Sequence, residues 1–332
     1  MKRVGFLKEK IVSLNNLYLA YNKVCRGKRG SSVIAEFAKD FDNNICALKL
    51  SLENNSVEIG QYHYFTIFDP KKRVICAASF VERIVHHAIM NVCHTFFDKR
   101  LVYSTYATRP HKGQYKALER AKTSMRKYAY SVKLDYRKYF DSISHDVLKR
   151  QLRRMFKDLW LLQLFDKIID SYCVKQGFGI PIGNLTSQYF ANMYLSELDH
   201  MLKEKYKVLE YIRYMDDILI FDNCKEKLKQ IVGIISEYSK KELSLSLKTP
   251  LFRKRTEGQV FLGYRVYANV CSLSSRSKRR FRTKFLKYSK LLKKGVWTQS
   301  EYQVHIIPLL AFVKHSNSSA FVRSCIDIED KR

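Results

Sequence analysis

Residues 211–221 read YIRYMDDILIF and are the stretch that decides the fold of this chain. An acidic pair, Asp216 and Asp217, lies between two short apolar runs, and Arg213 interrupts the first of them. Two strand-like runs around a tight acidic turn are typical of a β-hairpin. Adjacent carboxylates repel each other unless a positive charge lies between them, and aspartate oxygens suit Mg²⁺. Because Asp-Asp is also a common turn dipeptide, this stretch alone leaves a metal site and a plain turn open.

Earlier in the chain, Asp135 occupies a second setting that suits a metal ligand. Residues 132–136 alternate apolar and polar side chains, which predicts a half-buried strand with Asp135 on its polar face, at its carboxyl end. A helical pattern follows, with Ser144 as its cap and apolar residues at helical spacing as far as position 156. A strand, an acid, an aromatic turn and a helix, followed later by an acidic hairpin, indicate a metal centre.

Two-metal phosphoryl transfer uses such a set of carboxylates. Two Mg²⁺ ions, about 3.5–4 Å apart, stabilise the attacking and the leaving oxygen of an in-line displacement. We expect Asp135 and Asp216 to bridge the two ions and Asp217 to support them, with Tyr136 included among the metal ligands. Mn²⁺ can replace Mg²⁺ at such a site. The pattern therefore predicts nucleotidyl transfer on a palm-like sheet.

On these residues the chain resembles a reverse transcriptase. Asp135 matches the acidic position of motif A, and Tyr214–Asp217 matches motif C. Phe140 falls where reverse transcriptases carry an aromatic steric gate that excludes a ribose 2′-hydroxyl. The resemblance implies an RNA-directed DNA polymerase of the α+β class, with the right-hand polymerase fold: an antiparallel palm sheet, fingers and a helical basic thumb.

Two further segments extend the resemblance toward the N-terminus. Residues 71–83, KKRVICAASFVER, resemble the fingers hairpin, where Lys71 and Arg73 are expected to bind the triphosphate of the incoming nucleotide. Residues 104–118 resemble a segment of group II intron-like enzymes. Arg109 and Lys112 are the nucleic-acid contacts expected there.

The segment 179–195 carries the subfamily signal. It resembles motif B, a glycine turn followed by a helix beneath the nascent base pair. Most reverse transcriptases have Gln where this chain has Ile182, before Gly183, and Pro where it has Gln188. The run IGNLTSQ resembles the enzymes of diversity-generating retroelements, which copy a template RNA into cDNA with errors at template adenines. Ile182, Gly183 and Gln188 are therefore expected to contact the nucleotide.

The chemistry of Ile182 suggests a source of such errors. An amide at this position can hydrogen-bond the incoming nucleotide, whereas a branched apolar side chain cannot. One such bond is worth roughly 0.5–1.5 kcal/mol. We therefore hypothesise that Ile182 loosens the discrimination between correct and incorrect nucleotides.

Two motifs follow the acidic hairpin. Leucines at 243, 245 and 247 alternate with serines, which predicts a strand that leads into Lys248. The segment resembles motif D, in which Lys248 is a possible general acid for the departing pyrophosphate; a solvated surface lysine is the alternative. The next motif resembles the primer grip, motif E, and consists of Phe261, Leu262, Gly263 and Tyr264.

The charge of the chain indicates a polyanionic partner. The 332 residues carry a formal net charge of +30, from 61 basic and 31 acidic side chains, while 46% of residues are hydrophobic. Residues 276–294 contain ten basic side chains and no acidic one, interleaved with apolar residues, which predicts an amphipathic basic helix. In a reverse transcriptase this would be a thumb helix; a membrane surface is the alternative. The expected nucleic-acid contacts on it are Arg276, Lys278, Arg279, Arg280, Arg282 and Lys284.

The motifs divide the chain into four parts. Residues 1–60 are expected to form a helical, basic N-terminal extension, 61–130 the fingers with part of 140–185, 131–265 the palm, and 266–332 the helical thumb.

The eight cysteines include no CxxC pair, so a zinc site is not expected. The first residues do not resemble a secretory leader, so we expect a cytoplasmic protein of a bacterium, phage or archaeon.

The resemblance implies the partners as well. The expected substrates are a template RNA, a primer 3′-hydroxyl and deoxynucleoside triphosphates. The expected partners are a small basic accessory variability determinant protein and a structured non-coding RNA, with no membrane. Two alternatives stay open: a retron or group II intron-like reverse transcriptase, and an inactive scaffold that only binds RNA. Retron enzymes usually carry Ala where this chain has Met215.

Overall fold

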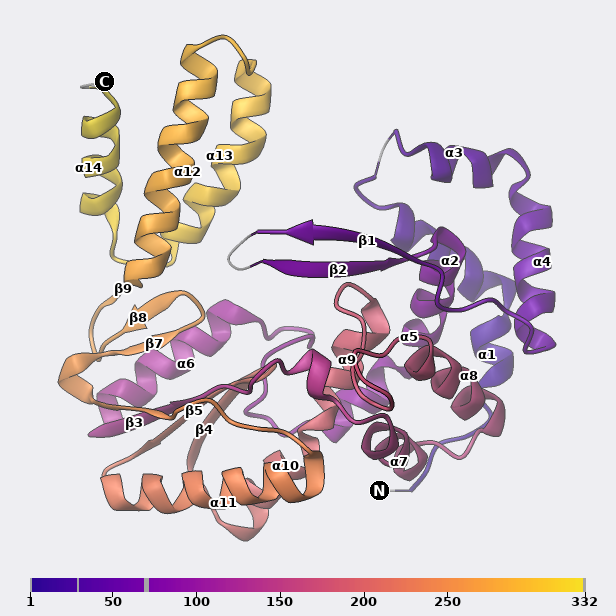
Figure 1. Ribbon diagram of the computed structural model, residues 1–332, viewed down its shortest axis with the longest axis horizontal. Coiled ribbons are helices and arrows are strands. Elements are labelled where there is room, and N and C mark those ends of the chain that lie inside the picture. The colour runs from indigo at the N-terminus through magenta and orange to yellow at the C-terminus, as the bar shows by residue number, and fades with distance from the viewer. Residues whose placement is uncertain (1, 29, 69–71, 331–332) are drawn as a thin grey trace. The chain divides into compact units, whose positions relative to one another are not determined.

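The computed structural model describes residues 2–28, 30–68 and 72–330 (Figure 1). The chain forms two compact units, each made of three chain segments. Unit 1 contains Met1–Tyr103, Tyr136–Tyr206 and Ile235–Ser246, and unit 2 contains Ser104–Asp135, Lys207–Ile234 and Leu247–Arg332. The four-part division expected from the motifs stays a prediction. No helix among the described residues is long and apolar enough to cross a membrane.

Unit 1 consists of helices and one two-stranded hairpin. Its elements are α1 (Lys8–Val12), α2 (Leu14–Cys25), α3 (Ser32–Lys39), α4 (Phe41–Glu53), β1 (Tyr62–Ile67), β2 (Arg73–Ala78), α5 (Phe80–Arg100), α7 (His145–Met155), α8 (Leu159–Asp170), α9 (Leu185–Tyr194) and α10 (Ser196–His200). As predicted, Ser144 caps α7, because its hydroxyl accepts from the N–H of Val147. Aromatic rings of α5, α8 and α9 meet in the core, where Phe97, Phe165 and Phe190 contact one another.

The loop before α9 is tied to the hairpin of unit 1. The N–H of Cys76 in β2 donates to the carbonyl of Ile182 at 2.8 Å, and the N–H of Ala78 donates to the side chain of Asn184 at 3.3 Å. Between them, Gly183 has a φ of 128°. A Cβ there would lie 2.8 Å from Cγ2 of Ile75 and 3.0 Å from the carbonyl oxygen of Cys76. Only glycine allows this close approach of two backbones.

Unit 2 is built on a four-stranded antiparallel sheet in the order β4-β5-β3-β6. The strands are β3 (Tyr130–Leu134), β4 (Glu210–Tyr214), β5 (Asp217–Asp222) and β6 (Leu251–Lys254), and α6 (Gln114–Lys127) packs against β4 and β5. Arg120 on α6 makes two hydrogen bonds of 2.7 Å to the buried carboxylate of Glu210 on β4. The predicted acidic hairpin and the predicted strand before Asp135 are both confirmed.

The C-terminal part of unit 2 combines a small sheet with a helical bundle. A three-stranded antiparallel sheet contains β7 (Gln259–Phe261), β8 (Tyr264–Val266) and β9 (Cys271–Leu273). It leads to α12 (Ser275–Lys293), which packs against α13 (Gln299–Lys314) and α14 (Ser319–Asp330) (Figure 1). One apolar core joins this bundle to α6 and the four-stranded sheet. The predicted basic helix of residues 276–294 is therefore confirmed as α12.

The strand predicted for residues 243–247 is wrong. Leu243 is the last residue of α11 (Lys225–Leu243), which begins in unit 2 and ends in unit 1. Ser244 then adopts a left-handed conformation, with a φ of 55°, and the N–H of Leu245 donates to the carbonyl of Ser239. Because the helix end turns in this way, Leu243 and Leu245 are both buried, each 1% exposed. The alternation of leucines reflects a helix terminus and not a pleated strand.

Gly183 offers a direct test of the loop geometry. We expect Gly183→Ala to lower the free energy of unfolding by roughly 1–3 kcal/mol, because the new Cβ meets backbone and the conformation becomes strained. The matched control is Gly233→Ala in α11, where no atom lies within 4 Å of the new Cβ; it should stabilise the helix by about 0.5–1 kcal/mol. Urea unfolding followed by circular dichroism measures both, and a shift of the same sign in the two variants would contradict the prediction.

Candidate active site

The register of the palm strands brings three carboxylates to one end of the sheet in unit 2. Leu134 at the end of β3 pairs with Ile218 of β5, so Asp135 follows directly beside Asp217. Tyr214 of β4 pairs with Asp217, which leaves Met215 and Asp216 as the turn of the hairpin. Residues from two distant chain segments therefore converge, as the sequence predicts.

Two lysines compensate part of this negative charge. Nζ of Lys248 lies 2.5 Å from Oδ2 of Asp135, and Nζ of Lys133 lies 2.9 Å from Oδ1 of Asp217. The main chain also holds the first pair together, because the N–H of Lys248 donates to the carbonyl of Asp135 at 2.8 Å. The Lys133 and Asp217 side chains are only 16% and 24% exposed, so solvent screens their attraction less than at an open surface.

The electrostatics of the turn show that the compensation is incomplete. Burial, and then the negative charges of Asp217 and Asp135, raise the pKa of Asp216 from 3.8 to about 6. Burial also raises the pKa of Asp217, although Lys133 opposes this shift. A site in which partly buried carboxylates have raised pKa values favours an additional cation.

A buried arginine hydrogen-bonds the main chain of the acidic turn. Arg213 in β4 is 0% exposed, and its Nη1 donates to the carbonyl of Met215 at 3.0 Å. Its backbone pairs on the outer side of β4 with the segment around Thr105, through the N–H of Arg213 to Ser104 and the N–H of Tyr106 to Arg213. Met215 has a φ of 56°, so the turn is left-handed there. The guanidinium fixes the main chain that carries Asp216.

The donor set fits a hard divalent cation in kind and in charge. Asp135, Asp216 and Asp217 offer carboxylate oxygens, the ligands that Mg²⁺ prefers. Within the described part of the chain, however, no group of three or more His, Cys, Asp or Glu side chains is arranged so that it could hold a metal ion. One oxygen of Asp135 and one oxygen of Asp217 face lysines instead. A metal ion at these residues would compete with the two lysines for those oxygens.

The other predicted metal and nucleotide residues belong to unit 1. Tyr136 is 1% exposed and its hydroxyl bonds to Ser239 at 2.8 Å, so only its main chain could serve a metal. Phe140 is half-buried in a 3₁₀ turn, and its carbonyl accepts from the N–H of Ile180. Gln188 is exposed on α9, and Arg73 is exposed at the start of β2. Lys71 lies outside the described residues.

The predicted primer grip forms the tight turn between β7 and β8. Phe261 and Tyr264 pair across it and are both 0% exposed, so their side chains pack in the core of unit 2. Leu262 and Gly263 form the tip, both with positive φ. The carbonyl of Gly263 accepts from the hydroxyl of Ser277 at 2.6 Å, which anchors the turn to the first turn of α12. If this motif contacts a primer, Leu262 and Gly263 supply the surface.

The predicted nucleic-acid contacts of unit 2 lie on two elements. Arg109 donates to the hydroxyl of Thr105 at 2.8 Å, and Lys112 lies over the ring of Tyr106 at 4.9 Å. On α12, the exposed side includes Arg276, Arg279 and Arg282, while Lys278, Arg280 and Lys284 are half-buried. Arg280 and Arg282 also lie over aromatic rings of α13 and α14. The basic helix keeps a charged outer side, and its phosphate-binding role stays a prediction.

Two site residues were not identified from the sequence, Lys133 and Arg213. Lys133 occupies a polar position of the β3 pattern, where a surface lysine is the ordinary expectation. Arg213 interrupts an apolar strand that is otherwise buried, and a charge in that setting was the available signal. The sequence did not show that the two cations lie beside the acidic turn.

Comparison with known proteins assigns the family. A model of the family described as reverse transcriptase (RNA-dependent DNA polymerase) matches residues 60–266, more than half of the chain. The chain therefore belongs to the reverse transcriptase family. This membership agrees with the α+β class and the antiparallel palm sheet, both of which the fold confirms.

The related proteins are distant in sequence. The COX1/OXI3 intron 2 protein of Saccharomyces cerevisiae is 22% identical over 335 residues, which cover 75% of this chain and 37% of that protein. The group II intron-encoded protein LtrA of Lactococcus lactis subsp. cremoris is 21% identical over 332 residues, covering 74% of this chain and 54% of LtrA. The retron Ec73 reverse transcriptase of Escherichia coli is 30% identical over 115 residues, covering 32% of this chain and 36% of that enzyme.

Among solved structures, telomerase from Candida albicans, in complex with a fragment of telomeric RNA, has a TM-score of 0.49 at 12% identity. The match covers 71% of this chain and 51% of that chain.

The raised pKa of Asp216 predicts a pH-dependent stability. An acid whose pKa is higher in the folded than in the unfolded protein stabilises the fold when protonated, and this stability is lost as the pH rises from 3.8 through about 6. In EDTA, Asp216→Asn should therefore unfold at a higher temperature than wild type at pH 7.5, and the gap should shrink toward pH 4. Thermal unfolding followed by circular dichroism measures this.

Added Mg²⁺ provides the internal control for that experiment. At pH 7.5 it should raise the unfolding temperature of wild type more than that of Asp216→Asn, because a ligand that binds only the folded state stabilises it. A gap between the two proteins that is constant from pH 4 to 7.5, or an equal response to Mg²⁺, would contradict this account of the site.

Proposed function

We propose that the protein is an RNA-directed DNA polymerase that copies a template RNA into cDNA. The observation that supports this most strongly is the convergence of Asp135, Asp216 and Asp217 at one end of the palm sheet. Family membership agrees with it. An inactive scaffold has no need of three carboxylates that repel one another at a partly buried site, since each costs stability without a cation.

The residues of the site have distinct roles in this proposal. The three aspartates hold divalent metal, Mg²⁺ or Mn²⁺, which supplies charge stabilisation to the attacking and leaving oxygens of phosphoryl transfer. Arg213 keeps the turn that carries Asp216 in place. Lys248 is a general-acid candidate for the pyrophosphate leaving group, because its ammonium already lies within the acidic site.

The remaining predicted residues serve substrate binding in the same proposal. Arg73 binds the triphosphate of the incoming nucleotide, and Phe140 excludes a ribose 2′-hydroxyl. The loop of Ile182 and Gly183 contacts the nucleotide beside Gln188. The basic side of α12 follows the phosphates of the template–primer duplex, which a chain of charge +30 attracts strongly at low salt.

At the level of the subfamily, we propose error-prone copying in a diversity-generating retroelement. The support is the IGNLTSQ run, whose Ile182 replaces an amide and whose Gln188 replaces a proline. A small basic accessory protein and a structured non-coding RNA are the partners of this proposal. A group II intron-like or retron reverse transcriptase is the second candidate, since LtrA and the retron Ec73 enzyme are among the relatives.

A primer-extension assay on an RNA template tests the polymerase. Wild type should extend the primer, and Asp216→Asn and Asp217→Asn should each reduce the rate by at least about a thousandfold, because each removes a charge that stabilises the transition state. The matched control is Asp222→Asn at the opposite end of β5, which should retain activity within about threefold. Equal activity of wild type and Asp216→Asn would exclude these carboxylates from catalysis.

Sequencing the cDNA tests the subfamily. Ile182→Gln restores an amide that can hydrogen-bond the nucleotide, so errors opposite template adenines should fall by about two- to tenfold. Errors opposite the other three bases serve as the control within the same reads and should change less. An error spectrum that is identical in wild type and Ile182→Gln would contradict a role for Ile182 in fidelity.

A further inference from the structure

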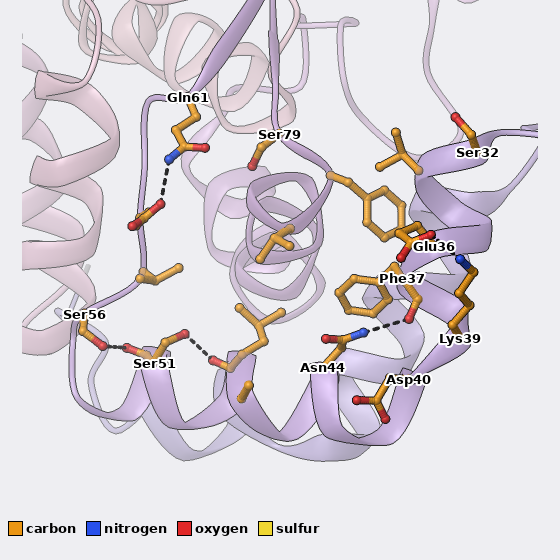
Figure 2. A pocket seen from close by; sticks show the side chains of 17 residues that line it. Ser32, Glu36, Phe37, Lys39, Asp40, Asn44, Ser51, Ser56, Gln61 and Ser79 are labelled. Carbon is orange, nitrogen blue, oxygen red and sulfur yellow. Dashed lines mark hydrogen bonds and ion pairs between the residues drawn. The ribbon is translucent and has the colours of Figure 1, made fainter.

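Unit 1 contains a groove that none of the predicted site residues lines. Figure 2 shows it between α3, α4 and the segment that leads from Ser56 to Gln61, with Ser79 at the start of α5. Its volume is about 1130 Å³, and all its lining residues lie within residues 32–81 of unit 1. The groove is therefore a feature of one unit and lies apart in sequence from the aspartates.

The floor and one wall of the groove are apolar. Phe37, Leu48 and Phe80 line it from three different helices, and the side chains of Val33 and Val81 are 52% and 37% exposed at its edge. Helix α3 has no buried residue, although Val33 and Phe37 stand four residues apart and both line the groove. An amphipathic helix normally buries its apolar side against another element. The apolar side of α3 therefore borders an open groove.

The charged residues that line the groove are mainly acidic, whereas the whole chain is basic. Residues 32–61 contain five acidic side chains and two basic ones, whereas the chain carries +30. Glu36, Asp40 and Glu58 line the groove, and its single lining lysine, Lys39, pairs with Glu36 at 2.6 Å. Phosphate groups would meet repulsion here, unlike at α12. This acidic lining suits a cationic partner better than a nucleic acid.

We propose that this groove binds a basic amphipathic helical segment of a partner protein. The apolar side of such a segment would cover Val33, Phe37 and Val81, in the way that amphipathic helices enter apolar grooves. Its lysines or arginines would meet Asp40 and Glu58 at the border. The inference rests on the groove alone and holds whether or not the chain polymerises DNA.

The test uses the full chain and two synthetic peptides in fluorescence anisotropy. The first peptide, of about eighteen residues or five helical turns, places Leu at helical spacing and Lys elsewhere. The second replaces every Lys by Glu. We expect the basic peptide to bind more tightly than the acidic one, although a protein of charge +30 attracts acidic peptides in general. This reversal of the general preference is the signature of the acidic groove.

Substitutions locate the binding. The double variant Asp40→Lys/Glu58→Lys should weaken binding of the basic peptide by about tenfold, and Val33→Lys, at an exposed position of α3, should weaken it by a similar factor. The matched control, Glu237→Lys, reverses an exposed charge on α11 outside the groove and should change binding less than twofold. Circular dichroism checks that each variant is folded. If the double variant does not fold, Val33→Lys alone still tests whether the peptide binds in the groove.

Three results would overturn the proposal. One is tighter binding of the acidic peptide than of the basic peptide. Another is binding of the basic peptide that Glu237→Lys weakens as much as Val33→Lys. The third is a concentration-dependent dimer, seen by sedimentation, that Val33→Lys abolishes, because this would assign the groove to a second copy of the chain.

Discussion

Mutual repulsion between carboxylates is the constraint on which the rest of unit 2 depends. The pairing of β3 with β5 forces Asp135 and Asp217 together, and the hairpin turn adds Asp216. The raised pKa of Asp216 records the cost. The fold meets part of this cost with two lysines, Lys133 on the sheet and Lys248 after it, while Arg213 holds the carbonyl of Met215 in the turn. A site built in this way is held together without metal and retains an excess of negative charge that attracts it.

The rigid frame around the turn explains how repelling groups keep their positions. Strand β4 is paired on both sides, with β5 and with the segment around Thr105. Helix α6 is linked to it through the hydrogen bond of Arg120 to Glu210. The same core continues to the tip formed by Leu262 and Gly263, whose backbone the first turn of α12 holds through Ser277. Motifs that are far apart in sequence thus share one packed core, which fixes the main chain that carries the acidic turn.

Charge is distributed so that different surfaces suit different partners. The outer side of α12 is strongly basic, and phosphate backbones bind such surfaces through release of counterions. The groove beside α3 combines apolar side chains with an acidic border, a combination that repels phosphates and favours a cationic protein segment. Both surfaces belong to a chain of net charge +30, so the acidic patch stands out against the general field.

The sequence by itself determined the elements whose signal is local. Each of these has the predicted structure, because its signal depends on neighbours along the chain: the alternation before Asp135, the acidic turn at Asp216, the glycine loop at Gly183 and the spacing of basic residues in α12. Only the tertiary structure decided which distant side chains meet, because strand register and burial set those contacts and local periodicity does not encode them. The ion pair of Lys133 with Asp217 was therefore not predicted, and the leucines at the end of α11 were predicted as a strand. In the same way, only packing could show that α3 leaves Val33 exposed while Phe37 packs on Phe80.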